Sequence, residues 1–312
     1  MNTLAGIIAA AAPLIYAAIG ETISEKAGVV NLSLDGSMLL SAMTGFAAAV
    51  ASGSVLVGFA AAIAVSVAIA AIVAFSGIEL RLNQIAVGFV LFLLARQLAL
   101  FLGDSYVGRA GPKVPAWDIP LLSEIPFVGT VLFSHNLSVY GAYVVVAVSY
   151  GFIYFTRTGL VLRGIGERPA AAFARGVPVN RLRYVYTLVG GALVGVAGAA
   201  VSLDQVAGWR ENLTTNLGWI ALAFVIFGGW HPLRVAGACL LYRGLLYVAS
   251  ELQGTFPSLV QVLGQLPFVL MILMLTVINT QWFRRLGDRH PRWRNLLGSN
   301  APSALGTAFH QE

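Results

Sequence analysis

Long apolar runs separated by short polar links dominate this sequence. Most of the runs are about 20 residues long, the length at which an α-helix crosses a hydrocarbon core about 30 Å thick. The pattern predicts an all-α fold, a polytopic transmembrane helical bundle. We predict nine spans, at residues 4–20, 29–51, 55–77, 85–102, 138–155, 184–203, 217–229, 233–250 and 259–281.

The composition agrees with a membrane protein. Hydrophobic residues make up 58% of the 312 residues, charged residues make up 10%, and the mean hydropathy is +0.82. Soluble domains carry about 25% charged residues, and a soluble fold could not bury this much apolar surface. The first run has no basic residues before it, so we expect a retained span and not a cleaved signal peptide. We expect a multi-pass protein of the cell (inner) membrane.

Two arginine-rich segments predict the topology. Six arginines lie between residues 157 and 183, and five lie between residues 284 and 294. Short basic loops stay on the cytoplasmic side, so we place both segments there. The four predicted spans between them are an even number, as this requires. The N-terminus and the long 103–137 link are then outside. The net charge of +6 is a loop feature and does not indicate a nucleic-acid partner.

Two predicted spans are abnormal. The first apolar run ends at Gly20, and the charged residues Glu21, Glu25 and Lys26 follow, so we expect the helix to break there. The seventh span, 217–229, is too short to cross as a regular helix and is bracketed by glycines. Transporters use short or glycine-interrupted segments to expose backbone groups to substrate. A tight helix hairpin is the alternative at each place.

The glycines of the sixth span predict close helix packing. They have small-xxx-small spacing, which lets neighbouring backbones approach; they are Gly190, Gly191, Gly195 and Gly198. The only cysteine, Cys239, lies within an apolar run, so no intramolecular disulfide can form. We assign residues 1–282 to one transmembrane domain and residues 283–312 to a basic cytoplasmic tail.

The predicted cytoplasmic loop contains a short helix, within residues 164–176. Pro169 suits a first helical turn, three alanines continue it, and Gly176 can end it. We expect Glu167 at its start, where a carboxylate favours the helix dipole. So short a helix is not stable alone in water. We expect a coupling helix that docks on a cytoplasmic ATPase, with a solvated basic loop as the alternative. The expected coupling residues are Gly166, Glu167, Arg168, Pro169, Ala170, Ala171 and Gly176.

Catalytic motifs are missing from the sequence. The only lysines, Lys26 and Lys113, do not follow glycine, so there is no phosphate-binding loop ending in Gly-Lys-Ser/Thr. Neither His-Glu-x-x-His nor Gly-x-Ser-x-Gly occurs, and the four histidines lack metal-ligand spacing. We expect no catalytic residue, metal site or cofactor in this chain, and ATP and Mg²⁺ at a separate ATPase.

Four separated motifs resemble one known class of membrane proteins. They are residues 20–36, residues 81–85, the predicted coupling loop, and residues 218–228 with the turn at 230–233. They resemble ABC transporter permeases of the branched-chain amino acid/simple sugar class, in its nucleoside-type subfamily, and most of all the shorter of its two permease subunits. The resemblance runs from about residue 5 to 282. Ser33 stands where a glycine is usual, and Asp35 stands where a glutamate is usual.

The resemblance implies the partners and the activity. It implies a second homologous permease subunit, a cytoplasmic ABC ATPase, and an extracytoplasmic substrate-binding protein that delivers a nucleoside or a similar small polar molecule. Import would proceed by alternating access across the lipid bilayer. A simple sugar is the alternative substrate. A stand-alone secondary transporter is the main rival, and it would need an ion-coupling group, for which Asp35 is the main intramembrane acid among these spans.

Polar residues near the abnormal spans are candidates for the substrate pathway. We place Asn31 and Asp35 in the broken second span, where they can hydrogen-bond ribose hydroxyls or a base edge. Helix capping is the alternative for both residues. Asn83 and Gln84 open the fourth span, and capping is their better interpretation.

Arginines inside spans are further candidates, because an intramembrane charge is costly. Arg243 is the stronger one, since it lies nearer mid-span, while Arg96 can snorkel outward. Trp209, Glu211 and Asn212 precede the short span at the outer mouth. There they can offer a stacking surface and a carboxylate to a ligand, although membrane-interface anchoring explains Trp209 equally well.

Overall fold

The computed structural model describes residues 2–120, 123, 125, 128–214, 216–255, 269, 272–273 and 301–309. Helices account for most of this part of the chain. A short antiparallel pair, β1 (Ala116–Asp118) with β2 (Ser134–Asn136), lies in the long link after the fourth span. The helices are α1 (Asn2–Lys26), α2 (Leu34–Ser52), α3 (Val55–Ile78), α4 (Gln84–Gly103), η1 (Asp104–Tyr106), α5 (Val128–Leu132), α6 (Leu137–Phe155), α7 (Arg157–Glu167), α8 (Pro169–Phe173), α9 (Val179–Ala200), the π-helical η2 (Val201–Gln205), α10 (Leu217–Phe227) and α11 (Pro232–Thr255).

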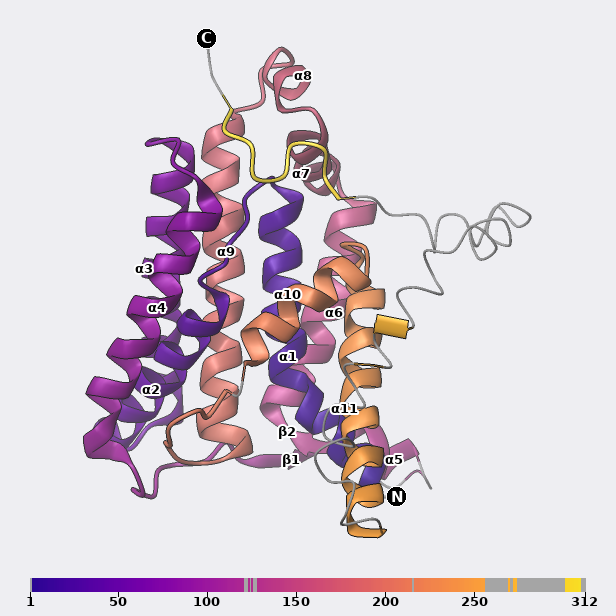
Figure 1. The fold of residues 1–312 in the computed structure, drawn as a ribbon. Helices are drawn as coiled ribbons and strands as arrows, with labels where there is room; N and C mark the ends of the chain where they lie inside the picture. Colours follow the sequence, from indigo (N-terminus) through magenta and orange to yellow (C-terminus); the bar gives the residue numbers. More distant parts are fainter. Residues whose placement is uncertain are drawn as a thin grey trace.

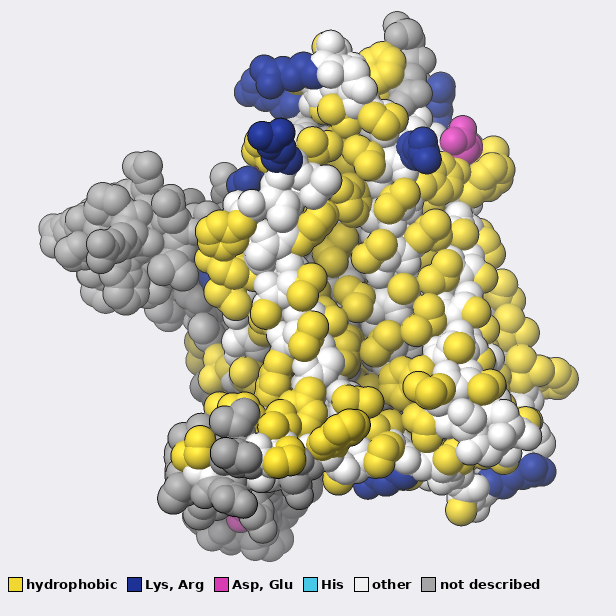
Figure 2. Space-filling model, turned by 180° about the vertical axis from the view of Figure 1, so that it is seen from behind, with side chains coloured by type: hydrophobic (Ala, Val, Ile, Leu, Met, Phe, Trp, Pro, Cys, Tyr) yellow, Lys and Arg dark blue, Asp and Glu magenta, His cyan; other side chains and the backbone are white. Residues whose placement is uncertain are grey.

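Within the described ranges, seven helices are long and apolar enough to cross a membrane: α1, α2, α3, α4, α6, α9 continued by η2, and α11. The apolar α10 is shorter, with 11 residues, as its sequence predicted. The long helices stand side by side in Figure 1. Figure 2 shows apolar side chains over the middle of the bundle and Lys and Arg near its two ends. The predicted all-α polytopic bundle is confirmed. Most of the ninth predicted span, 259–281, lies outside the described residues.

Glycines bring α9 close to its neighbours. This helix packs against α1, α2 and α3. A Cβ added to Gly190 would lie 2.6 Å from the Gly20 carbonyl oxygen of α1, and one added to Gly195 would lie 2.7 Å from the Ala62 carbonyl oxygen of α3. No side chain fits at such distances, so the close packing that the small-xxx-small spacing predicted is confirmed.

The first span is longer than predicted. α1 does not break after Gly20 but continues to Lys26. Its two carboxylates are buried and have partners: Glu21 Oε1 accepts the Asn31 backbone N–H at 3.0 Å, and Glu25 accepts the Trp230 indole N–H. Because these groups are satisfied inside the protein, the helix tolerates them at membrane depth. The predicted break was therefore wrong in position, and it lies at residues 27–33.

The helices α7 and α8 lie at one end of the bundle, and the N-terminal end of α1 lies at the other (Figure 1). Residues 301–309, here called the C-terminal segment, cross the same end as α7 and α8. The Ala304 N–H donates to the Gly166 carbonyl at 2.9 Å, and the Gly306 N–H donates to the Gly28 carbonyl at 3.0 Å. This part of the predicted tail thus packs against the bundle, while residues 283–300 lie outside the described part. Which end faces the cytoplasm stays a prediction.

Candidate functional site

Two charged side chains, Asp35 and Arg96, interact electrostatically where α2, α4 and the short α10 come together. Asp35, in the first turn of α2, is buried, and its Oδ1 accepts the Gly218 backbone N–H at 3.0 Å. The Arg96 guanidinium on α4 interacts electrostatically with this carboxylate. Arg96 Nη2 also donates to Asn212 Oδ1 at 3.3 Å. Three predicted pathway residues from separate parts of the chain, here called the Asp35 group (Asp35, Arg96 and Asn212), are thus connected.

Small residues make this junction possible. A Cβ on Gly218 would lie 2.3 Å from the Asp35 Cα, and a Cβ on Gly36 would lie 2.4 Å from the Phe92 carbonyl oxygen. The start of α10 and the middle of α4 therefore press directly against the start of α2. The Phe92 ring meets the Trp219 ring edge to face at 5.2 Å. An aromatic pair thus adjoins the buried carboxylate.

Asn31 lies in the link before α2 and not within a span. It is buried, and its Oδ1 accepts the Ser33 backbone N–H at 3.1 Å and the Ser33 hydroxyl at 2.5 Å. Together with the bond from its own N–H to Glu21, these contacts shape the link. They resemble the capping alternative more than an open ligand-binding amide. The sequence did not identify Glu21 as the partner of the Asn31 N–H. The spacing of four residues between Glu21 and Glu25 does place both acids on one helix face.

The two residues at the start of α4 differ in role. Asn83 Oδ1 accepts the N–H groups of Ile85 at 3.0 Å and Ala86 at 3.1 Å, so its predicted capping role is confirmed. Gln84 does not cap the helix. Its side chain is buried, and its Oε1 accepts the Val30 backbone N–H at 2.9 Å. The prediction for Gln84 was wrong, because this side chain ties α4 to the link between α1 and α2.

The residues predicted at the outer mouth separate into different environments. Trp209 is only 3% exposed, and its indole packs so closely on Gly103 that a Cβ there would lie 2.2 Å from Nε1. A buried indole offers no face to an arriving ligand, which corrects the predicted stacking surface. Glu211 is exposed, and Asn212 is exposed with a left-handed backbone at φ 57°.

Arg243 lies in the middle of α11 and is partly buried. Its Nε has no hydrogen-bond partner within the described ranges, and its charge acts on the side chains of Tyr242 and Cys239. The hydrogen bonds of the described residues do not connect it to the Asp35 group. Arg243 therefore stays a candidate separate from that group.

The predicted coupling segment contains two helices. The sequence predicts one short helix in a loop, and the structure adds α7 before it. α8 begins with Pro169 in its first turn and ends at Phe173, and Gly176 follows with φ 82°, as predicted. Glu167 is the last residue of α7 and not the start of the next helix, so its predicted dipole role was wrong. Arg168 is the single residue between the two helices.

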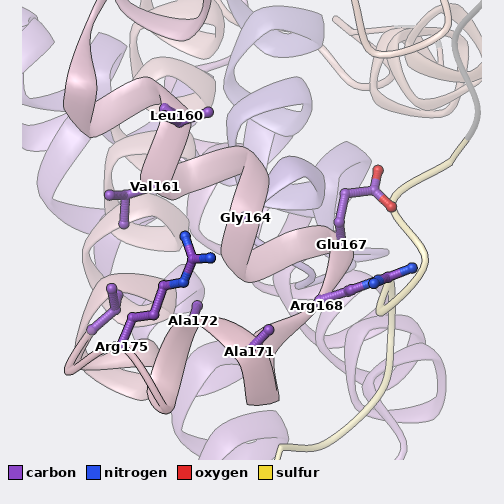
Figure 3. A pocket seen from close by; sticks show the side chains of 9 residues that line it. Leu160, Val161, Gly164, Glu167, Arg168, Ala171, Ala172 and Arg175 are labelled. Atoms are coloured by element: carbon purple, nitrogen blue, oxygen red, sulfur yellow. The ribbon is translucent and has the colours of Figure 1, made fainter.

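A hollow of about 490 Å³ lies between α7 and α8 (Figure 3). Its walls are mostly apolar, and Figure 3 shows Arg175 beside Ala172 and Val161 on one side of it. Ala171 of α8 is exposed at its edge, and Ala170 next to it is exposed as well. The lining residues are Leu160, Val161, Gly164, Glu167, Arg168, Ala171, Ala172, Arg175 and Val177.

The C-terminal segment contacts three helices at this end of the bundle. Ser303 Oγ donates to Glu167 Oε2 of α7 at 2.6 Å, and the Phe309 ring packs on the Phe173 ring of α8 at 5.8 Å. Arg183 of α9, 1% exposed, donates from Nη1 to a carbonyl of the same segment at 2.9 Å. One short segment thus holds α7, α8 and α9 together.

The fold and these sites define a multi-pass helical membrane protein with a buried polar junction and a polar end built from short helices. The chain belongs to the family of permease components of branched-chain amino acid transport systems, whose family model matches residues 3–275. It is accordingly a permease subunit of an ABC importer, a class whose permease subunits lack an ATPase site of their own. The family predicted from the four motifs is confirmed.

Relatives cover most of the chain. The putative glucose ABC transporter permease protein TsgC13 of Haloferax volcanii is 35% identical, over 88% of this chain and 84% of its own length. The guanosine ABC transporter permease protein NupQ of Bacillus subtilis is 31% identical, over 85% and 88%. The nucleoside ABC transporter permease protein NupC of Lactococcus lactis is 29% identical, over 89% and 93%. No solved structure matches the chain.

Proposed function

We propose that this permease forms half of the translocation pathway for a nucleoside and that the Asp35 group lines it. The observation that carries this proposal is the connection of Asp35, Arg96 and Asn212 at the start of the short helix α10. A carboxylate, a guanidinium and an amide are suited to bind hydroxyl groups and base edges. The Phe92 and Trp219 rings beside them supply apolar surface for a base.

The energy comes from a separate cytoplasmic ATPase that docks at α8 and at the hollow between α7 and α8. Ala170 and Ala171 give this helix a smooth exposed face, and Arg168 and Arg175 add positive charge beside it. A second homologous permease completes the pathway, and an extracytoplasmic binding protein delivers the solute. The protein works in the inner membrane.

A simple sugar is the second candidate solute. The 35% identity to a protein named as a putative glucose permease favours it. Ribose and glucose share the hydroxyl groups that the polar residues can bind, so the base is what distinguishes the two candidates. The aromatic pair next to Asp35 favours a nucleoside.

Uptake by cells that express the complete importer tests the proposal. We expect ATP-dependent uptake of radiolabelled nucleoside, which excess unlabelled nucleoside suppresses and excess glucose does not. Uptake of glucose alone would replace the nucleoside with the sugar. Full uptake with an inactive ATPase, driven by an ion gradient, would contradict the importer mechanism and favour a secondary transporter.

A further inference from the structure

Two cationic side chains lie over the ring of Tyr154, near the end of the bundle that carries α7, and a third acts on it electrostatically. Lys26 Nζ lies 5.9 Å from the ring centroid, and Arg163 Cζ lies 5.4 Å from it. Arg234 acts on the same phenol electrostatically. The three cations come from α1, α7 and α11, so the fold and not a basic run of sequence assembles them. They are called the Tyr154 cluster below.

Among the described residues, the charge of this cluster is only partly offset. In the part of the chain that the structure describes, none of the three cations forms an ion pair with a carboxylate. Glu167 acts on Lys26 through space and offsets part of its charge, while its Oε2 accepts the hydroxyl and the N–H of Ser303. The Nε groups of Arg163 and Arg234 are buried and have no hydrogen-bond partner among the described residues. Like charges this close repel one another, and a bound anion would relieve the repulsion.

His231 adds one ring N–H donor to the cluster without adding charge. Its ring lies 4.9 Å from the Tyr154 ring and 5.5 Å from the Tyr150 ring, and the residue is 7% exposed. Burial, together with the charges of Arg234 and Lys26, lowers the pKa of His231 to about 4, so the ring is neutral at pH 7. Its Nδ1 has no partner in the described structure. The helix α11 begins at the next residue, and its N-terminus adds positive potential.

Apolar side chains next to the cluster point outward. Phe155, which follows Tyr154, is 76% exposed, and Leu233, which precedes Arg234, is 45% exposed. Cations with a neighbouring exposed apolar surface are typical of a protein surface at the membrane interface, where lipid headgroups meet acyl chains. Basic pockets between spans on this kind of surface bind anionic headgroups. A free anion would make no use of the apolar side chains.

We propose that the Tyr154 cluster binds the phosphate of an anionic phospholipid, with its acyl chains against Phe155 and Leu233. The phosphate lies among Lys26, Arg163 and Arg234 and neutralises them. The bound lipid thereby ties α1 and α11 to α7. The hollow between α7 and α8 stays open for the ATPase, because none of the three cations of the Tyr154 cluster lines it.

The full-length chain, purified in a neutral detergent, tests this site. Phosphatidylglycerol, phosphatidylcholine and inorganic phosphate are added in separate samples, and binding is measured by native mass spectrometry and by the shift of the thermal unfolding midpoint. We expect phosphatidylglycerol alone to bind tightly and to raise the midpoint. The double variant Arg163→Gln with Arg234→Gln should weaken its binding about tenfold or more, because each removed charge costs several-fold in affinity.

Two further variants serve as controls. Arg163→Lys with Arg234→Lys keeps the charge and should keep the binding, which separates a charge effect from misfolding. Arg109→Gln removes an arginine that lies over the Tyr106 ring at 5.2 Å, away from the cluster, and should change nothing. Unchanged lipid binding by the double Gln variant would overturn the proposal. So would an equal midpoint shift with phosphatidylcholine, or with inorganic phosphate, which would make the ligand a free anion.

Discussion

Asp35 accepts the backbone N–H of Gly218 at 3.0 Å and so joins α2 to the first turn of α10 across 183 residues of sequence. The first N–H groups of any helix lack partners within the helix. α10 begins inside the bundle, where water cannot supply those partners, and the carboxylate takes their place. A negative charge at this position also complements the dipole of α10. Asp35 is therefore both a helix cap and a charged group of the proposed pathway.

Two substitutions at Asp35 separate these roles. Asp35→Ala removes the acceptor and leaves a buried N–H unpaired, which should lower the free energy of unfolding by about 1–3 kcal/mol. Asp35→Asn keeps an acceptor oxygen but removes the charge, so it should fold like the wild type and raise the KM for uptake. The thermal unfolding midpoint and the uptake kinetics of both variants check this. A wild-type KM for Asp35→Asn would show that the solute does not use the charge.

Arg243→Leu should abolish or redirect uptake while the protein still inserts and assembles. A charge at mid-span costs about 3 kcal/mol on insertion scales, and a role in the pathway or a buried pair repays that cost. Uptake kinetics and co-purification with the partner subunits measure the two effects. Tyr247→Leu, at an exposed position of the same helix, is the control and should transport normally. Unchanged kinetics in Arg243→Leu would remove this residue from the pathway.

The glycine packing of α9 gives a matched pair of substitutions. Gly195→Ala places a Cβ 2.7 Å from the Ala62 carbonyl oxygen, so α3 and α9 must separate. We expect the free energy of unfolding to fall by about 1–3 kcal/mol, the usual cost of overpacking. Gly151→Ala on α6 meets no atom within 4 Å and should be neutral or slightly stabilising. Equal thermal unfolding midpoints for the two variants would contradict the close packing.

Features encoded locally were predictable from the sequence. The span predicted at 55–77 is Val55–Ile78 in the structure, because an uninterrupted apolar run sets both its ends. The glycines of α9 allow close packing because they have no side chain. Pro169 and Gly176, at the two ends of α8, act through the backbone angles that each residue itself adopts. Their effects therefore need no knowledge of the rest of the fold.

Features that depend on distant partners were not predictable. The prediction of a break after Gly20 was wrong because the hydrogen-bond partner of Glu21 is Asn31, which lies in the link after α1 and not in the helix itself. Gln84 bonds to Val30, 54 residues away, and Trp209 is buried by the close approach of Gly103. No local sequence pattern encodes these long-range contacts. The sequence therefore suggests that such polar and aromatic side chains are accessible to a ligand, whereas the structure buries them.

Removing residues 301–312 should destabilise the end that carries α7 and α8. The C-terminal segment supplies the carbonyl that the Arg183 guanidinium binds, and a buried charge without that partner is unfavourable. It also supplies the Ser303 hydroxyl to Glu167. We expect the truncated protein to unfold at a lower temperature and to show faster hydrogen exchange in α7. Ser303→Ala alone should have a smaller effect in the same direction. Wild-type exchange in the truncated protein would show that the segment does not hold this end.

The substitution Ala171→Glu tests the coupling helix most directly. Ala171 is exposed at the edge of the hollow between α7 and α8. A helix of five residues needs an outside surface to stabilise it, and a small smooth face suits a groove in the ATPase. A bulky carboxylate there should prevent docking without disturbing the spans, because α8 lies at the end of the bundle.

We therefore expect the Ala171→Glu protein to insert normally, while uptake and substrate-stimulated ATP hydrolysis fall together by at least about tenfold, the effect of losing about 1.4 kcal/mol of docking free energy. Ala110→Glu is the matched control, since it adds the same side chain at an exposed position in another loop, and it should leave both activities unchanged. The measurements are uptake, ATP hydrolysis and co-purification of the ATPase. Normal uptake by the Ala171→Glu protein, with the ATPase recovered at wild-type yield, would show that residues 164–176 are a solvated loop and that docking occurs elsewhere.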